Sequence, residues 1–151
     1  MATCKMCEKS GWLLKVDNNG LCEHCEDIYL PQLLNYCRIV IESGQIIGKT
    51  KSTATKLSRI KVAADCCDKL IPYEKRGIPT LTENPSDVIR ELEKLRVETV
   101  SDEVFQLRFK AREKAKDAST DAGKLTGYNQ AISKLDKLMG EVEEGLSRCP
   151  R

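Results

Sequence analysis

Near the N-terminus, four cysteines constrain what this chain can fold into. They form two Cys-x2-Cys pairs, Cys4 with Cys7 and Cys22 with Cys25. Two intervening residues allow a tight knuckle that aims both sulfurs at one point, and thiolate sulfur is a strong ligand of Zn²⁺. Two knuckles close a tetrahedral site and leave no position for a substrate. The sequence therefore predicts one structural zinc ion held by these four side chains.

The same spacing also occurs in cysteine pairs that do not bind metal. Redox-active and disulfide-forming pairs also have it, but a thioredoxin-type redox pair follows a buried strand. Residues 1–3 leave no room for that strand. His24 stands between Cys22 and Cys25 and could replace one of them, although we expect it to be solvated. In a cytosolic chain, such pairs bind metal more often than they form disulfides.

The segment between the pairs predicts a β-hairpin. An apolar run over residues 11–16 precedes residues 17–20, which read Asp-Asn-Asn-Gly. Asn-Gly after such a run is a strong hairpin signal. A helical pattern starts at Glu23, which places the second pair at a helix N-terminus, where partial positive charge favours thiolates. We expect Trp12 to form the core of this small module.

Knuckle, hairpin and helix in this order resemble a treble-clef zinc finger. The resemblance covers about residues 1–30 and depends on the four cysteines. Treble clefs serve as structural stubs, nucleic-acid binders and protein-binding modules, so the resemblance implies a zinc module without selecting its function. We expect a zinc module at residues 1–30, followed by an α-helical domain at residues 31–151 that keeps its helices without the metal.

Two helices are predicted in the first part of that domain. Apolar residues recur at helical spacing from Leu30 to Ile41 and again from Leu57 to Ile71. Glycine is common just beyond a helix C-terminus. The first helix should therefore end near Gly44 and the second near Gly77.

Two more helices are predicted after a linker. Asn84 and Pro85 suit the N-cap and first positions of a helix, which we expect to be interrupted near Ser101. The last helix should begin between Gly123 and Gly127 and end by Gly145. The expected fold class is thus mainly α: a small treble-clef finger with a short β-hairpin, then two helical hairpins.

A weak internal repeat, at an offset of 68 residues, relates the second and fourth helices. Residues 68–71 (Asp-Lys-Leu-Ile) match residues 136–139 (Asp-Lys-Leu-Met). The hairpins resemble tetratricopeptide-type units in general build, without the 34-residue signature. The repeat predicts that Leu70 and Leu138 are both buried within their hairpins. Chance similarity between two amphipathic helices is the alternative.

Four cysteines remain outside the two pairs. Free cysteine packs as a small hydrophobe, so we expect Cys37 and Cys67 in the core. Neighbouring positions in a helix point to different faces, which predicts that Cys66 lies at the surface. Cys149 is expected to be a spectator thiol.

Composition indicates a soluble globular chain with nearly balanced charge. Its 151 residues are 32% charged and carry a net charge of +2, which argues against disorder and against a chain-wide nucleic-acid surface. There is no signal-peptide pattern and no apolar stretch approaching the roughly 20 residues that span a bilayer. We therefore expect a cytoplasmic protein that does not contact membranes.

One stretch has a local excess of positive charge. Basic residues occur here among Ser and Thr with no acidic residue between them, and such a run could contact phosphates. The aromatic interleaving of single-strand binders is missing, and a solvated helix entry is the alternative. The run consists of Lys49, Lys51, Lys56, Arg59 and Lys61.

Catalysis is not expected. No glycine-rich phosphate loop follows a strand, and a single histidine leaves little for acid–base chemistry. The preferred hypothesis is a zinc-stabilised protein-interaction or scaffolding module whose helical faces contact a protein partner. The first alternative is a DNA- or RNA-binding protein that uses the zinc module and the basic run. A regulatory subunit or detached fragment of a zinc-finger nuclease is the third.

Overall fold

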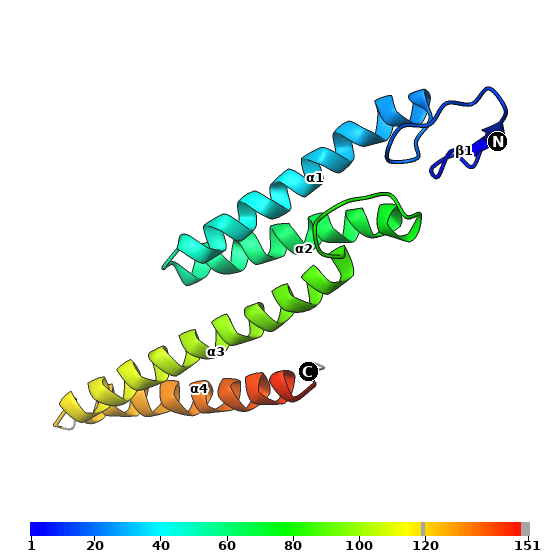
Figure 1. Cartoon of the computed structure of the whole chain (residues 1–151). Coiled ribbons are helices and arrows are strands. Elements are labelled where there is room, and N and C mark those ends of the chain that lie inside the picture. The colour runs from blue at the N-terminus through cyan, green and yellow to red at the C-terminus, as the bar shows by residue number, and fades with distance from the viewer. Residues whose placement is uncertain (119, 149–151) are drawn as a thin grey trace. The chain divides into compact units, whose positions relative to one another are not determined.

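The computed structural model describes residues 1–118 and 120–148, except for the side chains of residues 145–148. This part of the chain is mainly helical with a short N-terminal hairpin, which confirms the predicted fold class. Within these residues, no helix combines the length and the apolar composition that a membrane-spanning segment needs. The elements, in chain order, are β1 (Ala2–Thr3), β2 (Ser10–Gly11), α1 (Glu23–Lys49), α2 (Thr53–Lys75), α3 (Pro85–Asp117) and α4 (Ala122–Arg148) (Figure 1).

Strand pairing forms around the first cysteine pair. β1 and β2 are antiparallel, with Ala2 opposite Gly11. The hairpin predicted around the Asn-Asn-Gly turn is reduced to one antiparallel bridge, between Val16 and Cys22. The prediction of a hairpin was therefore right, but most of the pairing lies earlier in the chain than the turn residues indicated.

The core of the N-terminal part lies between α1 and α2. These helices pack against each other as an antiparallel hairpin. Apolar side chains at helical spacing meet between them, as expected for two amphipathic helices. The buried residues of this core include Leu33, Cys37 and Val40 of α1 and Cys66, Cys67, Leu70 and Tyr73 of α2.

Both Cys37 and Cys67 are buried, as predicted. The prediction that Cys66 lies at the surface is wrong, because only 6% of it is exposed. Ile78 belongs to the same core, and Val88 of α3 packs against it. The buried stripe of α2 is therefore wide enough to include two consecutive residues.

Two helix ends lie where glycine and proline in the sequence predicted them. α2 ends at Lys75, just before Gly77, and α3 begins at Pro85, as predicted. The predicted end of α1 near Gly44 is wrong, because α1 continues to Lys49. Ser43 and Ile47, which lie on either side of this glycine in the sequence, are both buried, so packing in the core continues the helix beyond Gly44.

The two helices in the second half of the helical domain also continue beyond the positions where the sequence predicted an interruption or an end. α3 is continuous through Ser101, and α4 continues through Gly145. An ion pair between Arg108 of α3 and Asp136 of α4 joins these two helices. The interruptions expected from single residues are therefore absent within the described part of both helices.

The contacts divide the chain into two compact units, residues 1–92 and residues 93–151. The predicted domain boundary after residue 30 lies inside α1, which crosses it without a break. Whether residues 1–30 fold on their own stays a prediction.

Burial differs between the two helices of the proposed repeat. Leu70 is fully buried, whereas 44% of Leu138 is exposed, so the prediction that both are buried is wrong. Within the described side chains of residues 93–144, only Thr99, Val104 and Ala115 are buried. A hairpin of two helices has no third layer to cover its remaining faces, which explains the exposure.

Candidate metal centre

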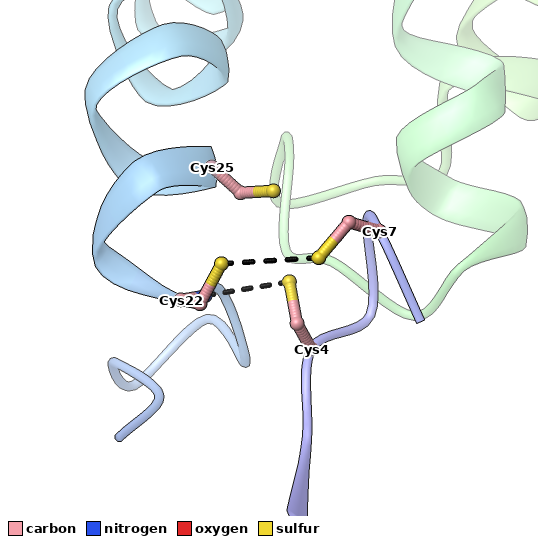
Figure 2. Close-up of side chains that lie close together, drawn as sticks. All are labelled: Cys4, Cys7, Cys22 and Cys25. Carbon is pink, nitrogen blue, oxygen red and sulfur yellow. Dashed lines mark hydrogen bonds between the residues drawn. The ribbon is translucent and has the colours of Figure 1, made fainter. Parts of the chain in front are cut away.

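The first knuckle is a closed backbone turn between β1 and β2. The N–H of Cys4 donates to the carbonyl oxygen of Lys9 at 2.9 Å, and the N–H of Glu8 donates to the carbonyl oxygen of Cys4 at 2.9 Å. Glu8 has a φ of 60°, a left-handed conformation that is uncommon outside glycine. This turn holds the side chain of Cys7 on the same side as that of Cys4 (Figure 2).

The second pair opens α1, as the sequence predicted. Cys22 is the N-cap residue, and its side chain caps no backbone N–H group. Its carbonyl oxygen accepts from the N–H of Glu26 at 2.8 Å, and Cys25 lies within the first helical turn. Because this sulfur does not cap the helix, it remains free to point at the first knuckle. The partial positive charge of the helix N-terminus favours thiolates here.

The structure brings the four predicted ligands together. All four Sγ atoms lie within 4.8 Å of one another, and their side chains point towards a common centre (Figure 2). The Sγ atoms of Cys7 and Cys22 are 3.8 Å apart. In a tetrahedron of sulfurs with metal bonds of about 2.3 Å, the edge is about 3.8 Å. These residues could therefore hold one tetrahedral metal ion.

The pKa values of Cys4 and Cys25 are shifted in opposite directions. Burial opposes ionisation of Cys4, but backbone hydrogen bonds from Cys7, Cys22 and Met6 outweigh it and lower the pKa of Cys4 to about 6. Burial, together with hydrogen bonds among the neighbouring thiols, raises the pKa of Cys25 to about 12. A cation at the centre favours the thiolate form of each ligand, so metal binding would release protons.

Asp17 shapes the turn before Cys22, a role that the sequence analysis missed. Its Oδ1 accepts from the N–H of Leu21 at 2.6 Å and of Asn19 at 3.0 Å, while its Oδ2 accepts from the side chain of Asn19 at 2.8 Å. Burial opposes ionisation of Asp17, but these hydrogen bonds outweigh it and lower its pKa. The signal was available, since Asp commonly opens such side-chain-capped turns.

Lys5 packs against the same turn. Its backbone N–H donates to the carbonyl oxygen of Gly20 at 2.9 Å. Gly20 has a φ of +84°, and a Cβ there would lie 2.7 Å from the Lys5 side chain. Glycine is therefore favoured at this position by its backbone conformation, and a Cβ there would also displace the side chain of Lys5.

The side chain of Lys5 reaches the C-terminal end of α2. Its Nζ donates to the carbonyl oxygen of Gly77 at 2.5 Å. Gly77 has a φ of +66°, and its N–H donates to Glu74, while the N–H of Ile78 donates to Tyr73. This is the Schellman arrangement that closes many helices. The knuckle is therefore attached to the helical hairpin by a hydrogen bond as well as by packing.

The metal centre and the helical core form one hydrophobic cluster. Cys4, Leu21, Cys22 and Cys25 are buried in the same cluster as the core residues of α1 and α2. The sulfur ligands therefore contribute to the core that holds the two helices together.

Two other predictions for this module had different outcomes. His24 is exposed, as expected, and is not one of the clustered ligands. The prediction that Trp12 lies in the module core is wrong, because 89% of it is exposed, as is 96% of Leu13. β2 ends at Gly11, and Leu14 rather than Trp12 packs against the buried cluster.

The basic run lies at the other end of the α1–α2 hairpin. Lys49 ends α1, Lys51 lies in the connection, and the other three residues are on the first turns of α2. Cys25 and Lys49 are separated by about 36 Å, from the helical rise of about 1.5 Å per residue. Within the described side chains, no ion pair includes a residue of the run.

Cys149, the predicted spectator thiol, lies outside the described residues. Comparisons with known proteins give no further guide to the site. No protein-family model matches the sequence. Neither the curated proteins nor the solved structures that were searched contain a match.

Proposed function

We propose that this chain is a non-catalytic protein-interaction module of the cytoplasm, stabilised by one zinc ion. The observation that carries the proposal is the pair of large apolar side chains, Trp12 and Leu13, exposed beside the metal centre. The zinc ion would be the structural element that holds their loop in place. The treble-clef resemblance supports this reading of residues 1–30.

Zinc is the ion that best suits the four cysteines. Tetrahedral sets of four sulfur ligands favour Zn²⁺ or iron, and structural zinc sites are closed, with no open coordination position. Three of the four cysteines are buried, and no second metal-binding group was found among the described residues. The site is therefore suited to holding the fold together. Reduced thiols are maintained in the cytosol, which supports the proposed compartment.

Trp12 and Leu13 have the properties of an interaction site. Tryptophan is enriched among the residues that dominate binding energy at protein interfaces. These two residues follow β2 directly, and the turn at Asp17 holds the other end of their loop. A loop anchored in this way loses little conformational entropy on binding. The two residues therefore offer an apolar contact that is already ordered.

A double substitution tests this proposal. Protein carrying Trp12→Ser and Leu13→Ser should lose a partner that the wild-type chain retains from its native host. Ile41→Ser is the matched control, since Ile41 is 56% exposed on α1, away from the loop. Binding should then be measured with the purified partner, and zinc counted by elemental analysis. Equal retention of the partner by the double variant would contradict the proposal, as would absence of zinc from the purified protein.

Nucleic-acid binding is the second candidate, favoured by the basic run with no ion-paired member among the described side chains. Its distance from the metal centre means that the zinc module and the run would not form one compact site. In a duplex-binding titration, each lost phosphate contact lowers the salt slope by about 0.9. Strong binding at physiological salt, abolished by Lys56→Glu with Arg59→Glu, would make this candidate the primary function.

A further inference from the structure

The only two phenylalanines of the chain are exposed on α3. Phe105 is 53% exposed and Phe109 is 57% exposed. Residues four apart lie on the same helical face, one turn above the other. The two rings therefore form a continuous apolar patch on the solvent side of the helix.

Charged residues extend this patch in both directions along α3. Acidic residues precede the phenylalanines and basic residues follow them, at alternating intervals of four and three positions. This is the spacing of a coiled-coil seam. We call these exposed residues the α3 seam: Glu98, Asp102, Phe105, Phe109, Arg112 and Lys116.

The α3 seam is distinct from the side of α3 that faces α4. Val104 and Ala115 are buried, and Arg108 forms an ion pair with Asp136 of α4. At 100° per residue, the stripe containing these residues is centred about 100° from the α3 seam. Among the seam residues, Arg112 also contacts α4, through an ion pair with Asp136 at 3.9 Å, and it is still an exposed side chain. The rings of Phe105 and Phe109 remain exposed beside the α3–α4 contact.

The order of charges along the seam makes it complementary to itself in one orientation. Against an antiparallel copy, Phe105 lies opposite Phe109, Asp102 opposite Arg112, and Glu98 opposite Lys116. A parallel copy in register would place each charge against its own kind. Like charges at such contacts are unfavourable and select against the wrong orientation.

We propose that two copies of this chain associate through antiparallel pairing of their α3 seams. A two-fold axis crosses α3 at the level of Leu107, so each copy contributes the same surface, as in most homodimers. Burial of the four phenylalanine rings drives the association. Exposed ion pairs contribute little affinity, and here they set the orientation. The seam is only about 27 Å long, so we expect a reversible dimer.

Charge reversal tests both the contact and its orientation. Sedimentation velocity over a concentration series should show a monomer–dimer equilibrium for the full-length wild-type protein. Asp102→Arg alone should weaken it about tenfold, since it places like charges opposite one another. Arg112→Asp alone should weaken it at least as much, because it also removes the contact of Arg112 with Asp136 of its own chain, and thermal unfolding of this variant measures that internal effect separately. The combined variant restores opposite charges only in the antiparallel arrangement, so its dissociation constant should return to within about threefold of wild type.

A second pair of variants tests the apolar contact. Phe105→Ser with Phe109→Ser should abolish the dimer, while Leu138→Ser, which removes an exposed apolar side chain outside the seam, should not. Far-UV circular dichroism should show unchanged helix content in every variant. A wild-type chain that stays monomeric, or a dimer that survives the double phenylalanine change, would overturn the proposal. Failure of the combined charge variant to recover would rule out the antiparallel orientation.

Discussion

The Nζ of Lys5 donates a hydrogen bond to the carbonyl oxygen of Gly77, 72 positions along the chain. This bond joins the first metal knuckle to the residue that closes α2. Arg76 makes a second contact of this kind, from its Nη1 to the Sδ of Met6 at 3.3 Å. The knuckle is thus attached to both helices of the hairpin: to α2 through these contacts, and to the start of α1 through the N–H of Cys22, which donates to the Sγ of Cys4 at 3.3 Å.

Removal of the Lys5 side-chain bond should weaken this attachment. We expect Lys5→Met to lower the free energy of unfolding by about 1 kcal/mol, the usual net contribution of one hydrogen bond. The measurement is urea unfolding of the metal-loaded protein. Lys9→Met is the matched control, because Lys9 is an exposed lysine of the same turn. Equal losses in the two variants would show that charge, and not the bond to Gly77, is responsible.

Metal removal should destabilise the α1–α2 hairpin. The sequence predicted that the helices survive without the ion, but the buried cluster contains three of the ligands together with the helical core. Structural zinc contributes roughly 10–16 kcal/mol in isolated finger peptides. Thermal unfolding followed by circular dichroism, with and without a strong chelator, checks this expectation. An unchanged unfolding midpoint would restore the original prediction.

Gly77 and Gly44 should respond to alanine with opposite signs. Gly77→Ala forces a side chain into a left-handed conformation and should cost about 1–2 kcal/mol. Gly44 lies within α1, and a Cβ there would meet nothing within 4 Å. Gly44→Ala should therefore stabilise the protein by about 0.5–1 kcal/mol. Denaturant unfolding of the two variants gives both values, and a loss at Gly44 would contradict the stated environment of α1.

Asp17 should matter through its hydrogen bonds and its charge. Asp17→Ala leaves the N–H of Leu21 without its side-chain acceptor and should cost about 2–3 kcal/mol, whereas Asp17→Asn keeps an acceptor and should cost less. Because folding lowers the pKa of Asp17, its charge stabilises the protein above its ordinary pKa of about 3.9. This stabilisation is lost as the pH falls through the folded pKa.

The pH dependence can be separated from loss of the metal by comparing variants. The difference in unfolding free energy between wild type and Asp17→Asn should narrow as the pH falls below about 4. Protonation of the cysteines affects both proteins alike and cancels in this difference. If this difference in unfolding free energy increased as the pH fell, the carboxylate of Asp17 would not be stabilising the turn.

Truncation of Leu70 and of Leu138 should lower the free energy of unfolding by different amounts, because only Leu70 lies in the core. Leu70→Ala should cost about 2–5 kcal/mol because Leu70 is fully buried. Leu138→Ala should cost less than about 1 kcal/mol, closer to the range of surface substitutions. Chemical denaturation of both variants is the measurement. Equal losses would support the internal repeat after all.

Local signals in the sequence were sufficient to predict the clustering of the four cysteines. Two residues between cysteines determine how their sulfurs converge, so the spacing of Cys4, Cys7, Cys22 and Cys25 was enough to predict their clustering. Gly77 marked a helix end for a similarly local reason, its left-handed backbone. These features depend on a few consecutive residues.

Features that depend on distant neighbours were not predictable in this way. Gly44 predicted a helix end, but α1 continues beyond it because Ser43 and Ile47 are packed in the core. Cys66 is buried in a cluster that also contains Cys67 and Ile78, a residue beyond the end of α2. Trp12 was expected inside because it is large and apolar, yet Leu21 and the buried cysteines already occupy the core of this part of the chain.

The position of Trp12 also determines what the protein's intrinsic fluorescence can report. It is the only tryptophan in the chain, and its indole is in contact with water. Its emission should therefore change little when the helices unfold, because the solvent around the ring stays the same. A molecule that covers the ring would shift the emission to shorter wavelength. For this protein, tryptophan emission is a probe of surface occupancy and a poor probe of folding.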